Sequence, residues 1–88
     1  MTDLNKEAEK GNNAKRIIED QAFLDAVSNV TSAVMFEWEN ETKTARREEL
    51  WLHQKVIKSV VNNLYYAMEN GEIAKNKLDT INKKGFFN

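Results

Sequence analysis

The sequence contains no cysteine, no proline and only three glycines among its 88 residues. Without cysteine the chain forms no disulfide and no thiolate metal site, and without proline it lacks the residue that most strongly breaks helices. No apolar run approaches the ~20 residues of a membrane-spanning helix, and residues 1–10 lack the apolar core of a signal peptide. The composition therefore predicts one small, soluble, helical chain that does not enter a membrane.

A surplus of either charge is also missing from the sequence. Lys and Arg number 13 and Asp and Glu number 14, with the two signs interspersed, and the formal net charge is −1. Proteins that bind nucleic acid through its phosphates concentrate Lys and Arg on one surface. The charge pattern therefore argues against nucleic acid as a partner.

Residues suited to catalysis or metal binding are equally scarce. His53 is the only histidine, and one imidazole is too few for a metal site, which needs several ligands. Glu49 precedes it by one helical turn and is placed to orient it, so we expect His53 to be a semi-buried core residue. We expect no catalytic residue, no metal site, no cofactor and no enzymatic activity.

The longest periodic stretch is residues 44–70, which we expect to form one helix. At about 100° per residue, Leu50, Ile57 and Leu64 fall on one line of a helical wheel. Other apolar residues widen this face to about half the circumference, whereas an ordinary surface helix has a stripe of ~100°. The added residues on one flank are Ala45, Leu52, Val56, Val60 and Ala67. We expect Val60 to lie at the centre of the buried face, which needs covering from two directions.

Two glycines predict where helices stop. Gly11 begins the run Gly-Asn-Asn, which is typical of a break, so residues 1–13 are expected to be a separate polar segment. A short helix over residues 14–19 would follow, and Asp20 is a typical N-cap for a helix that continues to about residue 40. Gly71 can close the central helix in the left-handed conformation, which leaves residues 73–81 as a weaker amphipathic stretch.

The short connection at residues 39–43 predicts that the two long helices are antiparallel neighbours. The expected fold is all-α, a long antiparallel helical hairpin with short flanking helices. Its helical domain would span residues 14–82, between the polar N-terminal segment 1–13 and a C-terminal tail 83–88.

Five aromatic residues are candidate partner contacts, namely Phe36, Trp51, Tyr66, Phe86 and Phe87. Phe36 projects toward the polar side of its helix, where it is either covered by the N-terminal segment or free to contact a partner. Phe86 and Phe87 follow Gly85, beyond the last helix signal, and either dock on another subunit or fold back over their own chain.

One pattern of residues across about positions 14–79 resembles a known group of proteins. It consists of Arg16-Ile17-Ile18-Glu19-Asp20, Phe23, Ala26, Trp38, Arg47-Glu48, Leu50-Trp51, Lys55, Leu64, Gly71 and the stretch 74–78. This pattern is similar to that of small helical proteins of tailed bacteriophages whose function is unknown. The resemblance implies a phage origin, and it transfers no activity and no functional residue.

These observations together predict a non-enzymatic phage protein that acts by helix-mediated assembly, as a minor virion or morphogenesis component. Its expected partners are further copies of itself or other phage structural proteins, in the virion or the host cytoplasm. Two alternative functions stay open. One is a small inhibitor that binds a host protein, and the other is a DNA-binding accessory of packaging or regulation.

Overall fold

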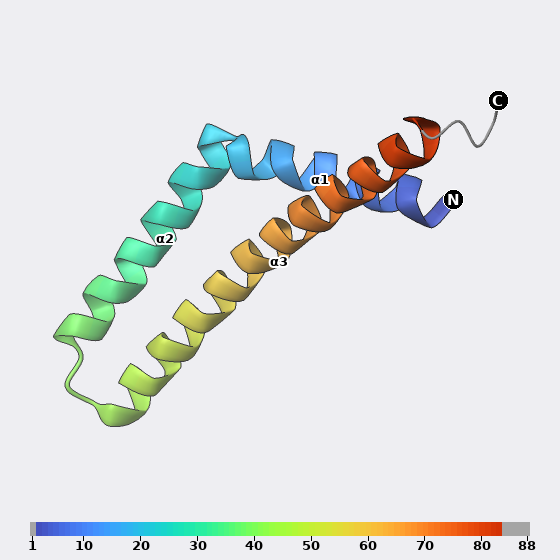
Figure 1. Ribbon diagram of the computed structural model, residues 1–88. Helices are drawn as coiled ribbons and strands as arrows, with labels where there is room; N and C mark the ends of the chain where they lie inside the picture. The colour runs from blue at the N-terminus through green and yellow to red at the C-terminus, as the bar shows by residue number, and fades with distance from the viewer. Residues whose placement is uncertain (1, 84–88) are drawn as a thin grey trace.

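The computed structural model of the chain describes residues 2–83 and is built from helices (Figure 1). Helix α1 spans Thr2–Glu19, α2 spans Gln21–Asn40 and α3 spans Thr44–Lys83. No strand occurs within the described residues, so the predicted all-α class is confirmed. In Figure 1, α2 and α3 run in opposite directions from the connection at residues 41–43, and α1 joins the far end of α2 to the C-terminal half of α3.

Hydrogen bonds made by Asp20 and Glu41 mark the two ends of α2. Asp20 has an extended backbone, and its Oδ1 accepts a hydrogen bond from the Phe23 N–H at 2.9 Å, as an N-cap residue does. At the other end, the Glu41 N–H donates to the Trp38 carbonyl oxygen at 3.4 Å, and Glu41 Oε1 accepts hydrogen bonds from the N–H groups of Thr42 and Lys43 in the connection at 3.1 and 2.9 Å. The predicted cap at Asp20 and the predicted end near residue 40 are therefore confirmed.

Both helix breaks predicted at glycine are wrong. Helix α1 runs through Gly11, and α3 runs through Gly71 to a length of 40 residues. The two glycines face each other where α1 crosses α3, because a Cβ built on Gly11 would lie 2.6 Å from the Gly71 Cα. Glycine inside a helix costs about 1 kcal/mol relative to alanine, and here it allows a backbone approach that no other residue permits.

The continuity of α1 and α3 changes the predicted arrangement. The expected boundary at residue 13 falls inside α1, and the expected third amphipathic stretch is the C-terminal part of α3. The short flanking helices of the predicted hairpin are therefore absent from the described residues. The predicted tail begins inside α3, at Lys83, and its remaining residues, 84–88, lie outside the described part.

The core of the molecule is small and lies at two places. Ala14 and Ala74 are 4% and 0% exposed beside the two glycines, and Leu50 is 2% exposed between α2 and α3. The chain is elongated, with extents of 68 × 24 × 15 Å and a radius of gyration of 19.1 Å. A compact domain of this length has a radius of gyration of about 12 Å. Most apolar side chains therefore meet solvent on at least one side.

The apolar face of α3 is covered only in part. Leu50 is buried and Ile57 and Leu64 are half-buried, so the predicted line of core residues is confirmed. In contrast, Val60 is 52% exposed and His53 is also exposed, so the expectation that both are core residues is wrong. Helix α1 ends at Glu19 and packs on α3 at Gly71, and α2 leaves Val60 at an open hollow between the two helices.

Candidate interaction surface

Large apolar side chains stay exposed on all three helices. They are Ile17, Leu24, Val30, Met35, Phe36, Trp51, Leu52, Val56, Val60, Tyr65, Tyr66 and Ile73. The accessible surface of the chain is 6892 Å². A compact monomer of 10.2 kDa has about 5,300 Å², so this chain exposes about 1,600 Å² more than its mass requires. This difference counts polar and apolar surface together; the exposed apolar side chains named above are the part of it that is typical of protein–protein contact sites.

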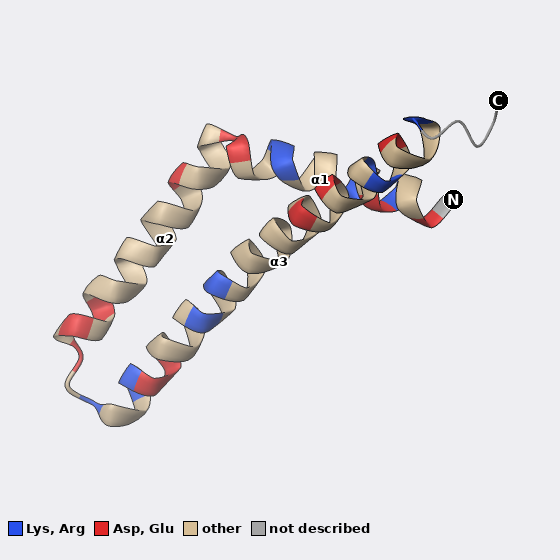
Figure 2. Cartoon of the chain, viewed as in Figure 1, with Lys and Arg blue, Asp and Glu red and all other residues tan. Residues whose placement is uncertain are grey.

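One face of the α2–α3 pair contains an apolar hollow of about 230 Å³, here called the valine groove. It is lined from α2 by Phe23, Ala26, Val27 and Val30 and from α3 by Val56, Ile57, Val60 and Val61. Val27, Ile57 and Val61 are half-buried, whereas Val30, Val56 and Val60 are 50%, 62% and 52% exposed. No charged side chain lines the groove, and residues 26–36 of α2 carry no charge at all (Figure 2).

The α3 side of the valine groove continues the surface that α1 covers. On a helical wheel, Val56 and Val60 lie on the same side of α3 as Ala67, Gly71 and Ala74. Ala74 and Gly71 are buried under α1, and Ala67 is half-buried. The same stripe is therefore core in the C-terminal half of α3 and exposed in the N-terminal half, because α1 ends at Glu19.

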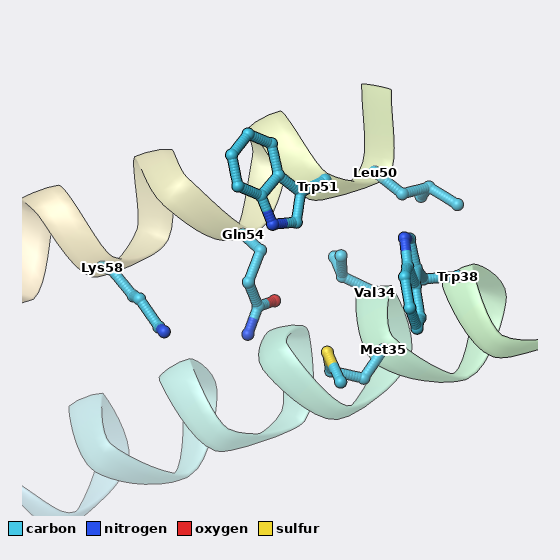
Figure 3. Close-up of a pocket in the computed structure, with 7 residues that line it drawn as sticks. All are labelled: Val34, Met35, Trp38, Leu50, Trp51, Gln54 and Lys58. Atoms are coloured by element: carbon cyan, nitrogen blue, oxygen red, sulfur yellow. The ribbon is translucent and has the colours of Figure 1, made fainter. Parts of the chain in front are cut away.

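The opposite face of the α2–α3 pair holds a second hollow of about 330 Å³, here called the tryptophan pocket (Figure 3). Its lining residues are Val34, Met35, Trp38, Leu50, Trp51, Gln54 and Lys58. In Figure 3 the Gln54 side chain extends from α3 toward α2. Gln54 Oε1 is buried and accepts no hydrogen bond from the described residues. This pocket, unlike the valine groove, contains polar and charged groups.

Cations cover both tryptophans near this pocket. The Arg47 guanidinium lies 4.0 Å from the centroid of the Trp38 ring, and Lys55 Nζ lies 4.1 Å from that of Trp51. Such contacts are worth about 0.5–1 kcal/mol at exposed sites. Trp51 is 52% exposed with Lys55 stacked on it, so a partner that contacts this ring also meets a positive charge.

One ion pair joins α2 to α3 next to the connection, and a second lies within α3. Arg46 donates hydrogen bonds to Glu49 Oε2 at 2.9 Å and to Glu37 Oε2 at 3.0 Å. These bonds, that to Glu49 first, raise the pKa of Arg46 above its ordinary value. The three side chains are 40–61% exposed, and solvent screens ion pairs of this kind strongly. The cluster therefore contributes little to stability, and its Arg46–Glu37 pair links α2 to α3 beside the connection.

Within the described residues, the predicted contact residues Phe36, Trp51 and Tyr66 do not lie together. Phe36 is 69% exposed and projects from the side of α2 that faces away from α3, so the N-terminal segment does not cover it. Tyr66 is 63% exposed on the outer side of α3, and Trp51 lines the tryptophan pocket. Phe86 and Phe87 lie outside the described residues.

Sequence reasoning missed the valine groove. The sequence does contain a pattern that indicates the groove. Val56 and Val60 are one turn apart on the flank that makes the apolar face of α3 too wide for one partner helix. A helical wheel shows that a face is apolar, but it does not show which segment covers it.

Comparisons with protein-family models, curated proteins and solved structures find no match to this chain. Within the described residues, no helix is long and apolar enough to cross a membrane. No group of three or more His, Asp or Glu side chains in residues 2–83 is arranged to hold a metal ion. The uncovered apolar surface is thus the feature of the described chain that most directly indicates a function.

Proposed function

We propose that this chain is a non-enzymatic protein that acts by helix-mediated assembly with other protein chains. The observation that carries the proposal is the set of exposed apolar side chains on all three helices, in a chain whose total accessible surface is about 1,600 Å² beyond that of a compact monomer of the same mass. Only Ala14, Leu50 and Ala74 are buried hydrophobic residues in the described chain. A core this small leaves a marginally stable monomer, and contact with a partner would complete it.

The proposed setting is a tailed bacteriophage, in which the chain serves as a minor virion or morphogenesis component. Its partners would be further copies of itself or other phage structural proteins, in the virion or in the host cytoplasm. The resemblance of residues 14–79 to small helical phage proteins supports this setting. The elongated shape, 68 Å in its longest dimension, suits a protein that bridges neighbours in a larger assembly.

Two exposed aromatic residues are the proposed contacts to those other proteins. Phe36 and Tyr66 are 69% and 63% exposed on the outer sides of α2 and α3. Aromatic side chains supply large contact area and are enriched among the residues that dominate interface energetics. Because neither residue lines a hollow of the α2–α3 pair, each remains available when that pair is covered.

Mass spectrometry of purified phage particles and of their assembly intermediates tests this proposal. A structural or morphogenesis component should be present in at least one of these fractions, in a fixed ratio to the other structural proteins. Absence from every fraction, together with capture of a single host protein, would instead indicate an inhibitor. Binding to DNA with an affinity that falls steeply with salt would indicate a nucleic-acid accessory.

A further inference from the structure

We infer that the valine groove is a dimer interface, and that its occupant is the valine groove of a second copy of this chain. The inference rests on the proposed function, because it names the first partner in that assembly and the surface that receives it. Three properties of the described residues lead to it, namely the area exposed, the absence of charge and the continuity of the groove with the existing core.

The surface that the chain exposes beyond that of a compact monomer, counted over the whole molecule, exceeds what a stable dimer needs. A standard interface takes about 800 Å² from each partner, which is about half of the additional surface that this chain exposes. The rim of the groove supplies side chains that are already half-exposed, since Val30, Val56 and Val60 are 50–62% exposed.

Charge decides which of the two hollows faces a second copy. In a two-fold interface the same patch of both copies meets itself, so a lining whose charged side chains are all lysines brings like charges together. The valine groove contains no charged side chain. The tryptophan pocket is lined by Lys58 and bordered by Lys55, which stacks on Trp51. The valine groove is therefore the self-complementary face.

The groove also continues a surface that the fold already uses as core. Val56 and Val60 lie on the side of α3 where Gly71 and Ala74 are buried under α1. A helix of the second copy would cover this stripe where α1 no longer reaches it. The α2–α3 pairs of the two copies would then enclose one apolar core of four helices, as in other helical bundles.

Two substitutions on α3 form a matched test in the full-length chain. Val60 and Ile73 are both β-branched and both 52% exposed, but only Val60 lines the groove. Sedimentation equilibrium of the wild type should show a dimer. Because a dimer carries each substitution twice, Val60→Asp should raise the dissociation constant at least about 100-fold. Ile73→Asp should change it less than about threefold, within the range of a rim or surface position.

Single-cysteine variants give a second measurement that does not depend on a charge being tolerated. The wild type has no cysteine, so Val60→Cys and Ile73→Cys each introduce one thiol. A short bis-maleimide should join two copies of the Val60→Cys variant and leave the Ile73→Cys variant unjoined. Circular dichroism checks that both variants keep the helix content of the wild type.

Several results would overturn the inference. They are a monomeric wild type, equal weakening by the two aspartates, and cross-linking at position 73 but not at position 60. The dimer and the proposed structural role in a phage can each be overturned without the other. A monomer found in phage particles overturns only the dimer, whereas a groove dimer that is absent from particles and from intermediates overturns only the structural role.

Discussion

Replacing Gly71 by alanine tests the packing of α1 against α3. A Cβ at this position would lie 2.6 Å from the Gly11 Cα, 3.1 Å from the Glu7 carbonyl oxygen and 3.2 Å from the Gly11 nitrogen. All three atoms belong to the α1 backbone and cannot rotate away as a side chain would. Since carbon atoms pack best at about 3.5–4.0 Å, α1 must move by about 1 Å.

The size of the effect follows from two opposing contributions. Overpacking costs about 1–3 kcal/mol, and a clash with fixed backbone belongs at the upper end of that range. In the opposite direction, the higher helix propensity of alanine stabilises the folded state by about 1 kcal/mol relative to glycine. The free energy of unfolding should therefore fall by about 2 kcal/mol, which for a domain of this size lowers the melting temperature by about 10 °C.

This change is measured by thermal unfolding followed by circular dichroism. The protein concentration is kept fixed because association makes the melting temperature depend on concentration. Asn12→Ala is the control, since Asn12 is exposed and adjoins Gly11 in α1. It should stabilise the chain by roughly 0.5 kcal/mol through propensity alone. If Gly71→Ala raises the melting temperature as Asn12→Ala does, the close crossing of α1 and α3 is refuted.

Three further predictions concern α2 and α3. Leu50→Ala should lower the free energy of unfolding by about 3 kcal/mol because Leu50 is 2% exposed. Leu52→Ala, at 54% exposure, should change it by less than about 0.5 kcal/mol, and equal effects in denaturant titrations would contradict this placement. Asp20→Ala removes the acceptor of the Phe23 N–H bond and should cost about 1 kcal/mol, while Asp20→Ser should restore most of the loss. Arg46→Gln should destabilise the chain more at low salt than at high salt. Because the pKa of Arg46 is raised, its contribution is fully present below the unfolded-state pKa and is lost only as pH rises through the raised value. The loss of unfolding free energy caused by Arg46→Gln should therefore be the same from about pH 6 to pH 9. A loss that changes with pH in that window would contradict this assignment.

The parts of the fold that sequence predicts well are those fixed by neighbouring residues. The cap at Asp20, the end of α2 near residue 40 and the core line through Leu50 and Ile57 follow from side-chain chemistry and period. The two glycines were misjudged for the opposite reason. Locally, Gly11 and Gly71 are weak helix residues, and only their contact with each other, 60 positions apart in the numbering, makes them favourable in helices.

The sequence predicts that α3 carries an apolar contact surface, but it does not predict which part of that surface stays exposed. A face covering half the circumference of α3 indicates contact from two directions, and the sequence places Leu52, Val56 and Val60 on that face. It does not show that α1 stops short of them, because that depends on where the chain turns at Asp20. The aromatic candidates were chosen by residue type, and two of them, Phe36 and Tyr66, are among the most exposed apolar side chains.

The mass of the full-length chain in solution, measured by light scattering across micromolar concentrations, tests most directly whether the exposed apolar surface is an interface. The proposal of helix-mediated assembly with a second copy predicts a mass of about twice 10.2 kDa, which falls toward that of the monomer on dilution. A mass of 10.2 kDa at every concentration, together with a cooperative thermal transition, would contradict it.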